Sequence, residues 1–400
     1  MTRRIVHLGV GNFHRAHQAW YTQQAGGWSI TGVSLRSPRL RDQLAPQGFD
    51  YTLAIRDAAG EQLEQITVID SILFAPEQSQ AVLDAIASAD LITLTITEKG
   101  YCLGPDGKLD LANPDIKSDL AGTPTSAIGY LTHGLAKRKT PVTVISCDNL
   151  NANGKALENA VKSFAQAAGF TLPGGLAFPC TMVDRITPAT TQALSDHIAA
   201  HARPAAAPVE TESFTEWVIE DHFAGPRPAW EKAGAQIVPD AAPYKLRKLR
   251  MLNGAHSLLA YAGLLKGHEF VHEAIADTAL RKKVEGLFNE AAQTLSSAIE
   301  TKDYAAALLT RFENPNLHHK LRQIAMDGTQ KLPVRLLGTI SDLNGDAPNA
   351  QASIAAWTQF AMSETAAGRP LEDPSADEIA SACNSENPAK ALKTLIGYPT

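Results

Sequence analysis

The pattern of hydrophobic positions in this chain changes near residue 240. Before that point, short β-prone runs alternate with stretches at helical spacing, and after it almost every periodic segment is helical. The predicted strands are 5–8, 30–35, 51–55, 66–69, 91–96 and 141–146, and the helices among them include 78–88 and 125–137. The later predicted helices are 245–261, 275–299, 304–312, 316–326, 331–342, 348–364 and 377–395. We therefore predict an α/β domain over residues 1–240 and a mostly helical domain over residues 241–400.

The first predicted strand runs directly into a glycine-containing turn. Gly9 and Gly11 form a GxG pair, and Asn12 and Phe13 follow where a helix is expected to begin. Glycines in this position let the backbone approach the pyrophosphate of a dinucleotide, and the helix N-terminus supplies amide donors. The third glycine of the GxGxxG pattern is missing, since His14 follows Gly11 by three residues. The location after an N-terminal strand still favours a dinucleotide site.

The end of the second predicted strand bears on which dinucleotide is bound. NAD-binding folds usually place Asp or Glu there, where the carboxylate holds the ribose hydroxyls. Here the strand ends in Leu35, Arg36, Ser37 and Pro38, with no acid. Arg36 and Ser37 could instead accept a 2′-phosphate. We expect NAD as the coenzyme of this dinucleotide site, and these two residues make NADP the alternative. A third interpretation is that Arg36 only flanks the adenine.

Polar residues follow three further predicted strands. Thr97 and Glu98 lie just beyond the fifth strand, Asn149 lies beyond the sixth, and Asp184 belongs to a later strand-to-loop transition. Ligands of parallel sheets bind at the carboxyl ends of the strands. These four residues are therefore candidates for contacts with a coenzyme or substrate.

The predicted helix 245–261 carries an unusual polar trio. Lys248, Asn253 and His256 stand five and three residues apart. On an ideal α-helix Asn253 and His256 share a face, and Lys248 is about 140° from Asn253. An amine, a carboxamide and an imidazole can take a proton and hold an oxyanion. An ordinary amphipathic helix could carry the same residues, so the trio alone does not decide the function.

Composition limits the class of protein. The chain has 400 residues, of which 44% are hydrophobic and 20% charged, and 36 basic against 42 acidic residues give a net charge of −6. This balance argues against general binding to nucleic acids or anionic membranes. No apolar run is long enough for a membrane span or a signal peptide, and the four cysteines form no CxxC pattern. We expect a soluble, cytoplasmic protein with reduced thiols.

A second motif points to different chemistry. Residues 268–272, HEFVH, match the HExxH pattern of zinc peptidases, in which two histidines one helical turn apart bind the metal. Gly267 precedes the motif and the helical periodicity ends at Leu265. We therefore expect no metal site here, and we keep a zinc hydrolase as a minor alternative.

Taken together, six ordered motifs resemble those of the mannitol dehydrogenase family, the polyol-specific long-chain dehydrogenases. They are residues 9–17 (GVGNFHRAH), 97–101 (TEKGY), 146–154 (SCDNLNANG), 182–188 (MVDRITP), 216–223 (EWVIEDHF) and 248–256 (KLRMLNGAH). The resemblance implies an N-terminal Rossmann-type dinucleotide-binding domain and a helical C-terminal domain. It also implies an NAD(P)-dependent oxidoreductase that needs no metal.

The resemblance further implies roles for individual residues. Lys248 would be the general base that takes the proton of a secondary alcohol. Asn253 and Asn149 would donate hydrogen bonds to the oxygen as it gains charge, and His256 would hold the substrate hydroxyl or steer the lysine. Asp184 would support the nicotinamide end or the substrate.

The substrate is expected to be a polyol or a sugar acid. Lys331 and Arg335, four residues apart, could clamp a carboxylate, or they could form a solvated basic helix end. We expect interconversion of D-mannonate and D-fructuronate, with D-mannitol and D-fructose as the alternative pair. The family often has a glutamate where this chain has Lys245, and its members are usually longer. A monomer or weak oligomer is expected, and a non-catalytic dinucleotide-binding redox sensor remains the alternative from another class.

Overall fold

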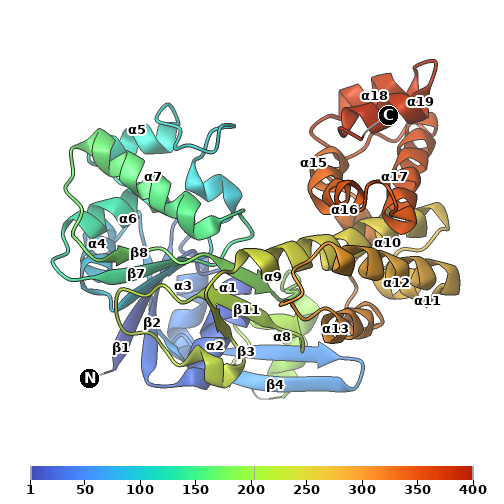
Figure 1. The fold of residues 1–400 in the computed structure, drawn as a ribbon. Coiled ribbons are helices and arrows are strands. Elements are labelled where there is room, and N and C mark those ends of the chain that lie inside the picture. Colours follow the sequence, from blue (N-terminus) through green and yellow to red (C-terminus); the bar gives the residue numbers. More distant parts are fainter. Residues whose placement is uncertain (1, 202, 399–400) are drawn as a thin grey trace. The chain divides into compact units, whose positions relative to one another are not determined.

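The computed structural model describes residues 2–201 and 203–398, and the chain forms two compact units. The first unit contains the residues up to Arg56 together with Gly60–Ala242. The second contains Asp57–Ala59 and the chain from Pro243 onward. Figure 1 shows the course of the chain through both units.

The first unit is built on a six-stranded parallel sheet with the order β5-β2-β1-β6-β7-β8. Its strands are β1 (Arg3–Leu8), β2 (Trp28–Ser34), β5 (Ile69–Phe74), β6 (Leu91–Leu94), β7 (Val142–Ser146) and β8 (Leu176–Ala177). The strand order reverses between β1 and β6, and that is the point at which open α/β sheets bind ligands.

Alternate residues of the strands face two separate cores. In β1, Val6 and Leu8 pack into one core and Ile5 into the other. Successive side chains of a strand point to opposite faces, so a sheet buried on both sides needs such nearly continuous apolar runs. Helices α4, α6 and α7 cover one face, and α2 and α3 lie on the other (Figure 1). The helices of this unit are α1 (Asn12–Ala16), α2 (Gln18–Ala25), α3 (Arg39–Leu44), α4 (Ser79–Ser88), α5 (Pro114–Leu120), α6 (Ala127–Ala136), α7 (Asn153–Ala168) and α8 (Gln192–Ala200).

Two small sheets complete the first unit. One has the order β10-β3-β4 and the other β12-β11-β9. Their strands are β3 (Tyr51–Asp57), β4 (Gly60–Ile66), β9 (Thr181–Asp184), β10 (Val209–Glu212), β11 (Glu216–Glu220) and β12 (Gln236–Val238). Each of these sheets contributes a fully buried aromatic side chain, Tyr51 from β3 and Trp217 from β11, to the core that also contains residues of α2. Short 3-10 turns lie at Ala45–Gln47, Glu98–Tyr101 and Trp230–Ala233.

The second unit is helical. Its α-helices are α9 (Ala242–Arg247), α10 (Gly254–Leu265), α11 (Val271–Ala276), α12 (Thr278–Gln293), α13 (Lys302–Phe312), α14 (Leu321–Ile324), α15 (Gly328–Leu332), α16 (Gly338–Asp342), α17 (Pro348–Ala366), α18 (Ala376–Cys383) and α19 (Pro388–Leu395). Two π-helical segments, Lys248–Asn253 and Pro333–Leu337, interrupt the longer helices. Helix α10 lies at the centre and packs against α11, α12, α14 and α17.

The fold class predicted from the sequence is confirmed, but several element boundaries are wrong. The segment 66–69 is not a strand, because Ile66 ends β4 and Ile69 begins β5. The predicted helix 275–299 spans a break at Asp277, whose carboxylate caps the start of α12 by accepting from the Ala279 and Leu280 amides. It also ends earlier, at Gln293. Local capping therefore overrides a continuous apolar period.

Other predicted helices are shorter or divided. Within 316–326 only Leu321–Ile324 is helical. The segment 377–395 forms two helices, because Asn387 caps a new helix that has Pro388 at its first position. Helices 245–261 and 331–342 are each interrupted by one of the π-helical segments.

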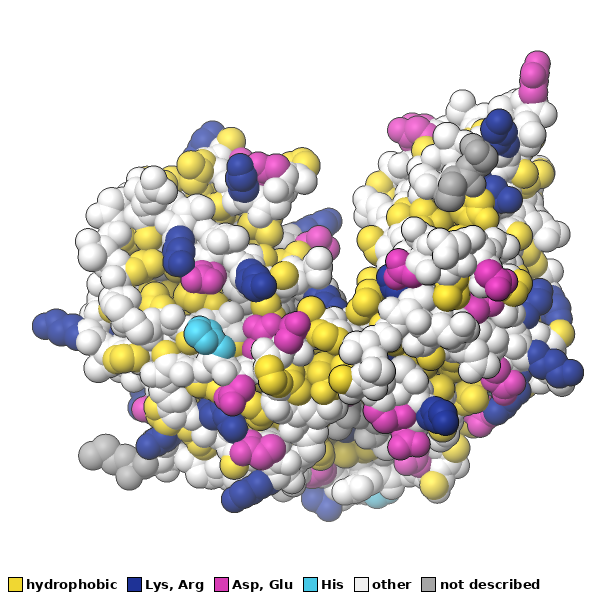
Figure 2. Space-filling model, in the orientation of Figure 1, with side chains coloured by type: hydrophobic (Ala, Val, Ile, Leu, Met, Phe, Trp, Pro, Cys, Tyr) yellow, Lys and Arg dark blue, Asp and Glu magenta, His cyan; other side chains and the backbone are white. Residues whose placement is uncertain are grey.

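The surface carries mixed charge. On the face shown in Figure 2, acidic and basic side chains are interspersed and neither sign forms an extended patch. Among the described residues, no helix is both long and apolar enough to span a membrane. The four cysteines are free thiols, and Cys102, Cys147 and Cys180 are buried.

Candidate functional site

The turn after β1 can be made only by glycine at its first position. Gly9 has a φ of +94°, and a Cβ atom there would lie 2.2 Å from the carbonyl oxygen of Thr95. The Gly9 amide donates to the carbonyl of Val33, at 2.9 Å, which fixes the turn across the end of the sheet. Gly11 then precedes α1. This is the close backbone approach that a pyrophosphate needs.

The missing third glycine has a structural explanation. His14 occupies that position, is fully buried, and stacks on the ring of His7 at 3.4 Å between centroids. His7 is itself held by the hydroxyls of Thr93, at 2.7 Å, and Thr95, at 2.9 Å. Burial lowers the pKa of His7 to about 3 and that of His14 well below its usual value. Two neutral imidazoles therefore fill the space beneath the turn.

A cavity of about 850 Å³ opens at the carboxyl ends of β1, β2 and β6. This volume is within the range of small-molecule and coenzyme sites. Of the residues predicted to contact a coenzyme, those that line it are Gly9, Gly11, Asn12, Arg36 and Thr97. The glycine turn and the size of the cavity fit a dinucleotide.

Asn12 and Phe13 also have structural contacts. The Asn12 amide donates to the hydroxyl of Thr190 at 3.1 Å, and its oxygen accepts from Arg15 at 2.6 Å. The ring of Phe13 stacks on His17, with 5.0 Å between centroids. Both residues hold α1 in place, whatever contact they make with a coenzyme.

Asp148 holds the loop that contains Thr97, a role that the sequence did not indicate. The Asp148 carboxylate accepts from the amides of Ile96, at 3.1 Å, and Thr97, at 3.0 Å, and from the Tyr101 hydroxyl at 2.8 Å. Thr97 has a φ of +64°, a conformation that needs such support in a non-glycine residue. Burial raises the pKa of Asp148. Glu98 begins the following turn and is exposed.

Asn149 and Asp184 belong to two segments of the first unit, the loop after β7 and strand β9. The side chain of Asn153 connects these two segments. Asn149 is exposed in the loop after β7, and Asp184 is buried at the end of β9. The buried amide of Asn153 donates to the carbonyl of Ser146 at 3.1 Å, and its oxygen accepts from the Thr181 amide at 2.9 Å. Asn153 thus ties the end of β7 to the start of β9. The sequence did not indicate this role of Asn153.

The predicted catalytic helix is not a continuous α-helix. Lys248–Asn253 is π-helical, between α9 and α10. In a π-helix each amide bonds the carbonyl five residues earlier, so residues five apart come close to the same side. Lys248 and Asn253 therefore approach one face, instead of lying about 140° apart as on an α-helix. His256 follows Asn253 by three residues in α10 and shares that face.

His256 is a buried, neutral imidazole. Its ring lies 5.0 Å from that of Phe312 and 5.1 Å from that of His319, and its Nε2 atom has no hydrogen-bond partner among the described residues. Burial lowers the pKa of His256 well below its usual value, and the positive charges of Arg311, Arg335 and other neighbours lower it further. An unpartnered ring nitrogen in such a position is available to a ligand.

Arg335 approaches the same helix from the second π-helical segment. Pro333 begins that segment and has no amide hydrogen to continue an α-helical ladder. The guanidinium of Arg335 donates to the Ser257 hydroxyl at 3.0 Å and to the Asn253 carbonyl at 3.5 Å. Arg335 forms no ion pair within the described chain, and burial lowers its pKa.

Lys331 is engaged differently. Its ammonium donates to the carbonyl of Met326 at 2.8 Å and pairs with the carboxylate of Asp327 at 3.1 Å. Lys331 therefore already has a direct ion-pair partner. Arg335 has none within the described chain, and Asp327 acts on it only through its charge, which partly opposes the lowering of the pKa of Arg335 by burial. Of the two residues predicted to clamp a carboxylate, Arg335 is the stronger candidate.

The HExxH segment does not form the helix that its zinc chemistry requires. His268 lies between α10 and α11, and α11 begins only at Val271. His272 stacks on Phe270 at 5.6 Å, and His268 lies 4.0 Å from the carboxylate of Asp277. In the described parts of the chain, no three His, Cys, Asp or Glu side chains are grouped as metal ligands would be.

Comparison with known proteins covers nearly the whole chain. Residues 3–232 match the mannitol dehydrogenase Rossmann domain, and residues 240–398 match the mannitol dehydrogenase C-terminal domain. The D-mannonate oxidoreductase of Escherichia coli (strain K12) is 39% identical, over 98% of this chain and 87% of that protein. A mannitol 2-dehydrogenase of Phaeosphaeria nodorum is 37% identical, over 98% of this chain and 75% of that protein.

Solved structures show the same relationship. The mannitol 2-dehydrogenase of Pseudomonas fluorescens, in a ternary complex with NAD and D-mannitol, superposes with a TM-score of 0.81 at 31% identity, covering 99% of this chain and 92% of that one. A substrate-free D-sorbitol dehydrogenase superposes with a TM-score of 0.86 at 29% identity, covering 98% and 91%.

Proposed function

Because the chain belongs to the mannitol dehydrogenase family, we propose that it is a nicotinamide-dependent oxidoreductase that interconverts the secondary alcohol of a sugar acid and the corresponding ketone. The lead reaction is that between D-mannonate and D-fructuronate. The observation that carries this choice is Arg335, a half-buried cation that forms no ion pair within the described chain and contacts Asn253. Partial removal of this charge from water is unfavourable and lowers the pKa of Arg335, so its position favours an anionic group on the substrate.

The proposed base is Lys248. In the oxidation direction its amine takes the proton of the substrate hydroxyl while the hydrogen on the same carbon leaves as hydride and a carbonyl forms. A bound nicotinamide supplies the acceptor for that hydride. Because an amine can perform the proton transfer, the proposed mechanism assigns no step to a metal.

Two neighbours of Lys248 act on the oxygen. The amide of Asn253 donates a hydrogen bond that strengthens as negative charge develops there, and the loss of one such donor typically costs about 10²–10³ in rate. His256 is neutral, so it can donate one hydrogen bond and accept another without competing for the proton. We assign it to a substrate hydroxyl.

The first unit holds the coenzyme. Gly9 and Gly11 would receive the pyrophosphate, and Thr97 would line the same cavity. By family resemblance we assign Asn149 and Asp184 to the nicotinamide end or the substrate. The assignments of Gly9, Gly11 and Thr97 rest on the cavity that they line, whereas those of Asn149 and Asp184 rest on sequence position alone.

The alternative substrate is D-mannitol, which the solved relative from Pseudomonas fluorescens binds. D-mannitol lacks a carboxylate, so it would leave Arg335 without an ionic partner. The two hypotheses differ in the charge of the substrate, and a matched pair of compounds can separate them.

The test is a coenzyme-linked absorbance screen at 340 nm. D-mannonate and D-mannitol are offered for oxidation, and D-fructuronate and D-fructose for reduction, each with both nicotinamide coenzymes. We expect a higher kcat/KM for the sugar acids. A higher value for the neutral pair would move the assignment to mannitol 2-dehydrogenase chemistry, and no turnover of any compound would support a non-catalytic binding protein.

A further inference from the structure

The end of β2 carries positive charge and no carboxylate. Leu35, Arg36 and Ser37 follow the last residue of the strand, and Arg39 begins α3; all four line the cavity. In a Rossmann-type fold the adenosine ribose lies at this strand end. A carboxylate here binds the two free ribose hydroxyls, whereas an arginine accommodates a 2′-phosphate.

Neither Arg36 nor Arg39 forms a buried ion pair within the described chain. The side chain of Arg39 makes no hydrogen bond or ion pair within the described chain. Arg36 has one ion pair, to Asp115 of α5 at 2.9 Å, and the two side chains are 75% and 33% exposed. Exposed ion pairs of this kind contribute little to stability. A phosphate could therefore replace Asp115 as the partner of Arg36 at small cost.

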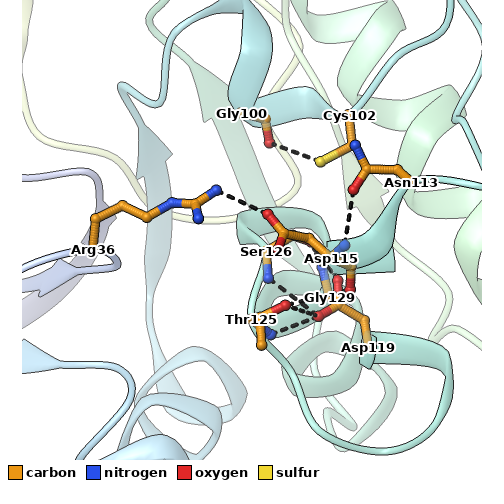
Figure 3. Close-up of polar contacts among 9 residues, drawn as sticks. All are labelled: Arg36, Gly100, Cys102, Asn113, Asp115, Asp119, Thr125, Ser126 and Gly129. Atoms are coloured by element: carbon orange, nitrogen blue, oxygen red, sulfur yellow. Dashed lines mark hydrogen bonds and ion pairs between the residues drawn. The ribbon is translucent and has the colours of Figure 1, made fainter. Parts of the chain in front are cut away.

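Asp115 is held in place beside the cavity wall. Its amide donates to the Asn113 side chain at 2.9 Å, and its carbonyl accepts from the Thr125 hydroxyl at 3.3 Å. Asp119, one turn later, accepts from the amide of Ser126 at 3.1 Å. Figure 3 shows Arg36 extending toward this group of residues from a separate part of the chain. Thr125 and Ser126 line the cavity, so Asp115 lies beside its wall. The ion pair with Asp115 therefore holds the guanidinium of Arg36 near this wall.

Other nearby carboxylates are already paired elsewhere. Asp42 and Glu77 both bind Arg41, at 2.8 and 2.6 Å, and neither lines the cavity. No acid among the cavity-lining residues could take the ribose diol in the manner of an NAD-specific strand end.

We propose that this pocket accepts a 2′-phosphate on the adenosine ribose, with Arg36 as its principal partner and Ser37 and Arg39 beside it. The chain would then bind NADP(H) more tightly than NAD(H). The inference rests on the proposed function only in taking the ligand to be an adenine dinucleotide.

The test uses two probes that differ only in the 2′-phosphate, adenosine 2′,5′-bisphosphate and adenosine 5′-monophosphate. Their affinities are measured by isothermal titration calorimetry at fixed ionic strength. A charge-assisted contact should make the bisphosphate bind about tenfold to a hundredfold more tightly. Neither probe contains a nicotinamide, so the result does not depend on whether sugar acids are turned over.

Three variants test whether Arg36 is the residue that binds the 2′-phosphate. Arg36→Ala should bring the two affinities close together without weakening the monophosphate. Asp115→Asn should keep or increase the difference, because it frees Arg36. Arg41→Ala is the matched control, since this arginine pairs with Asp42 and Glu77 outside the cavity, and should change neither affinity. Equal binding of the two probes by the native protein, or an equal loss for both in Arg36→Ala, would overturn the proposal.

Discussion

The guanidinium of Arg335 donates a hydrogen bond to the hydroxyl of Ser257 across 3.0 Å. This contact joins the two helices that contain π-helical segments. A Cβ atom added at Gly254 would lie 3.4 Å from Leu336 and 3.6 Å from the Arg335 carbonyl, so the segments also pack directly against each other. π-helical turns are often found at functional sites, and here they bring the half-buried cation of Arg335 next to the proposed catalytic helix.

The first prediction concerns substrate charge. Arg335→Ala should lower kcat/KM for D-mannonate by about 10- to 100-fold, because a charge-assisted contact with the carboxylate is lost. Activity toward D-mannitol, where it can be measured, should fall less. Arg335→Lys should recover only part of the loss, since an ammonium cannot bind a carboxylate through two parallel hydrogen bonds. Steady-state kinetics on both substrates provide the measurement.

The matched control for this prediction is Arg281→Ala. Arg281 lies in α12 and is paired with Glu285 and Glu313 on the surface. Its removal should therefore leave kcat/KM for D-mannonate and for D-mannitol unchanged. An equal loss for the acid and the polyol in Arg335→Ala would show that Arg335 supports the helix and does not recognise a carboxylate.

The second prediction concerns the coenzyme turn. Gly9→Ala should abolish binding of ADP-ribose, because the new Cβ would lie 2.2 Å from the Thr95 carbonyl in a backbone with φ of +94°. Gly26→Ala is the control, since Gly26 has a φ of +68° but open space around it. That variant should lose about 1–3 kcal/mol of stability, because its backbone conformation strains any side chain, and should keep its affinity. Calorimetry would contradict the account if Gly9→Ala bound ADP-ribose as tightly as Gly26→Ala.

The third prediction concerns acid stability. Burial lowers the pKa of His7 to about 3 and that of His319 to about 4, and it lowers the pKa of His14 and His256 well below the ordinary value of 6.5. The unfolded chain therefore binds protons between pH 6.5 and pH 4 that the folded chain does not. The stability from these groups is complete above pH 6.5 and is lost as the pH falls, by about 1.4 kcal/mol per pH unit for each histidine.

This fall should be visible as a decrease in Tm between pH 7.5 and pH 5.0. His319→Asn should reduce the steepness of the decrease by removing one of the four groups. A Tm that stays constant over this range would contradict the burial of neutral histidines in both units.

Much of the fold could be predicted from local sequence patterns. The β-prone runs around Val6 and Leu94 are buried on both faces, so their composition indicates parallel strands whatever the neighbouring elements are. Gly9 could be predicted to make the coenzyme turn because only glycine satisfies its backbone. The change near residue 240, from β-prone runs that alternate with helices to helices alone, likewise follows from the spacing of hydrophobic positions.

The π-helical segments could not be predicted in this way. The apolar spacing around Lys248 suits an α-helix, and the insertion of one residue in the hydrogen-bond ladder depends on packing against the helix of Arg335. Tertiary contacts also decide the roles of Asp148 and Asn153. Asp148 bonds Ile96, 52 residues away, and Asn153 bonds Thr181, 28 residues away. Pro333 within a predicted helix is the one local signal that could have indicated a break.

In the proposed mechanism Lys248 is the general base. The most direct test is Lys248→Ala, with hydride transfer to the coenzyme followed at 340 nm and ADP-ribose binding measured in parallel by calorimetry. Lys266→Ala, at the end of α10 and paired with Asp277, is the control that should keep full activity. We predict that Lys248→Ala binds the nucleotide normally and loses at least about 100-fold in turnover. Turnover within a few-fold of the native protein would contradict the assignment.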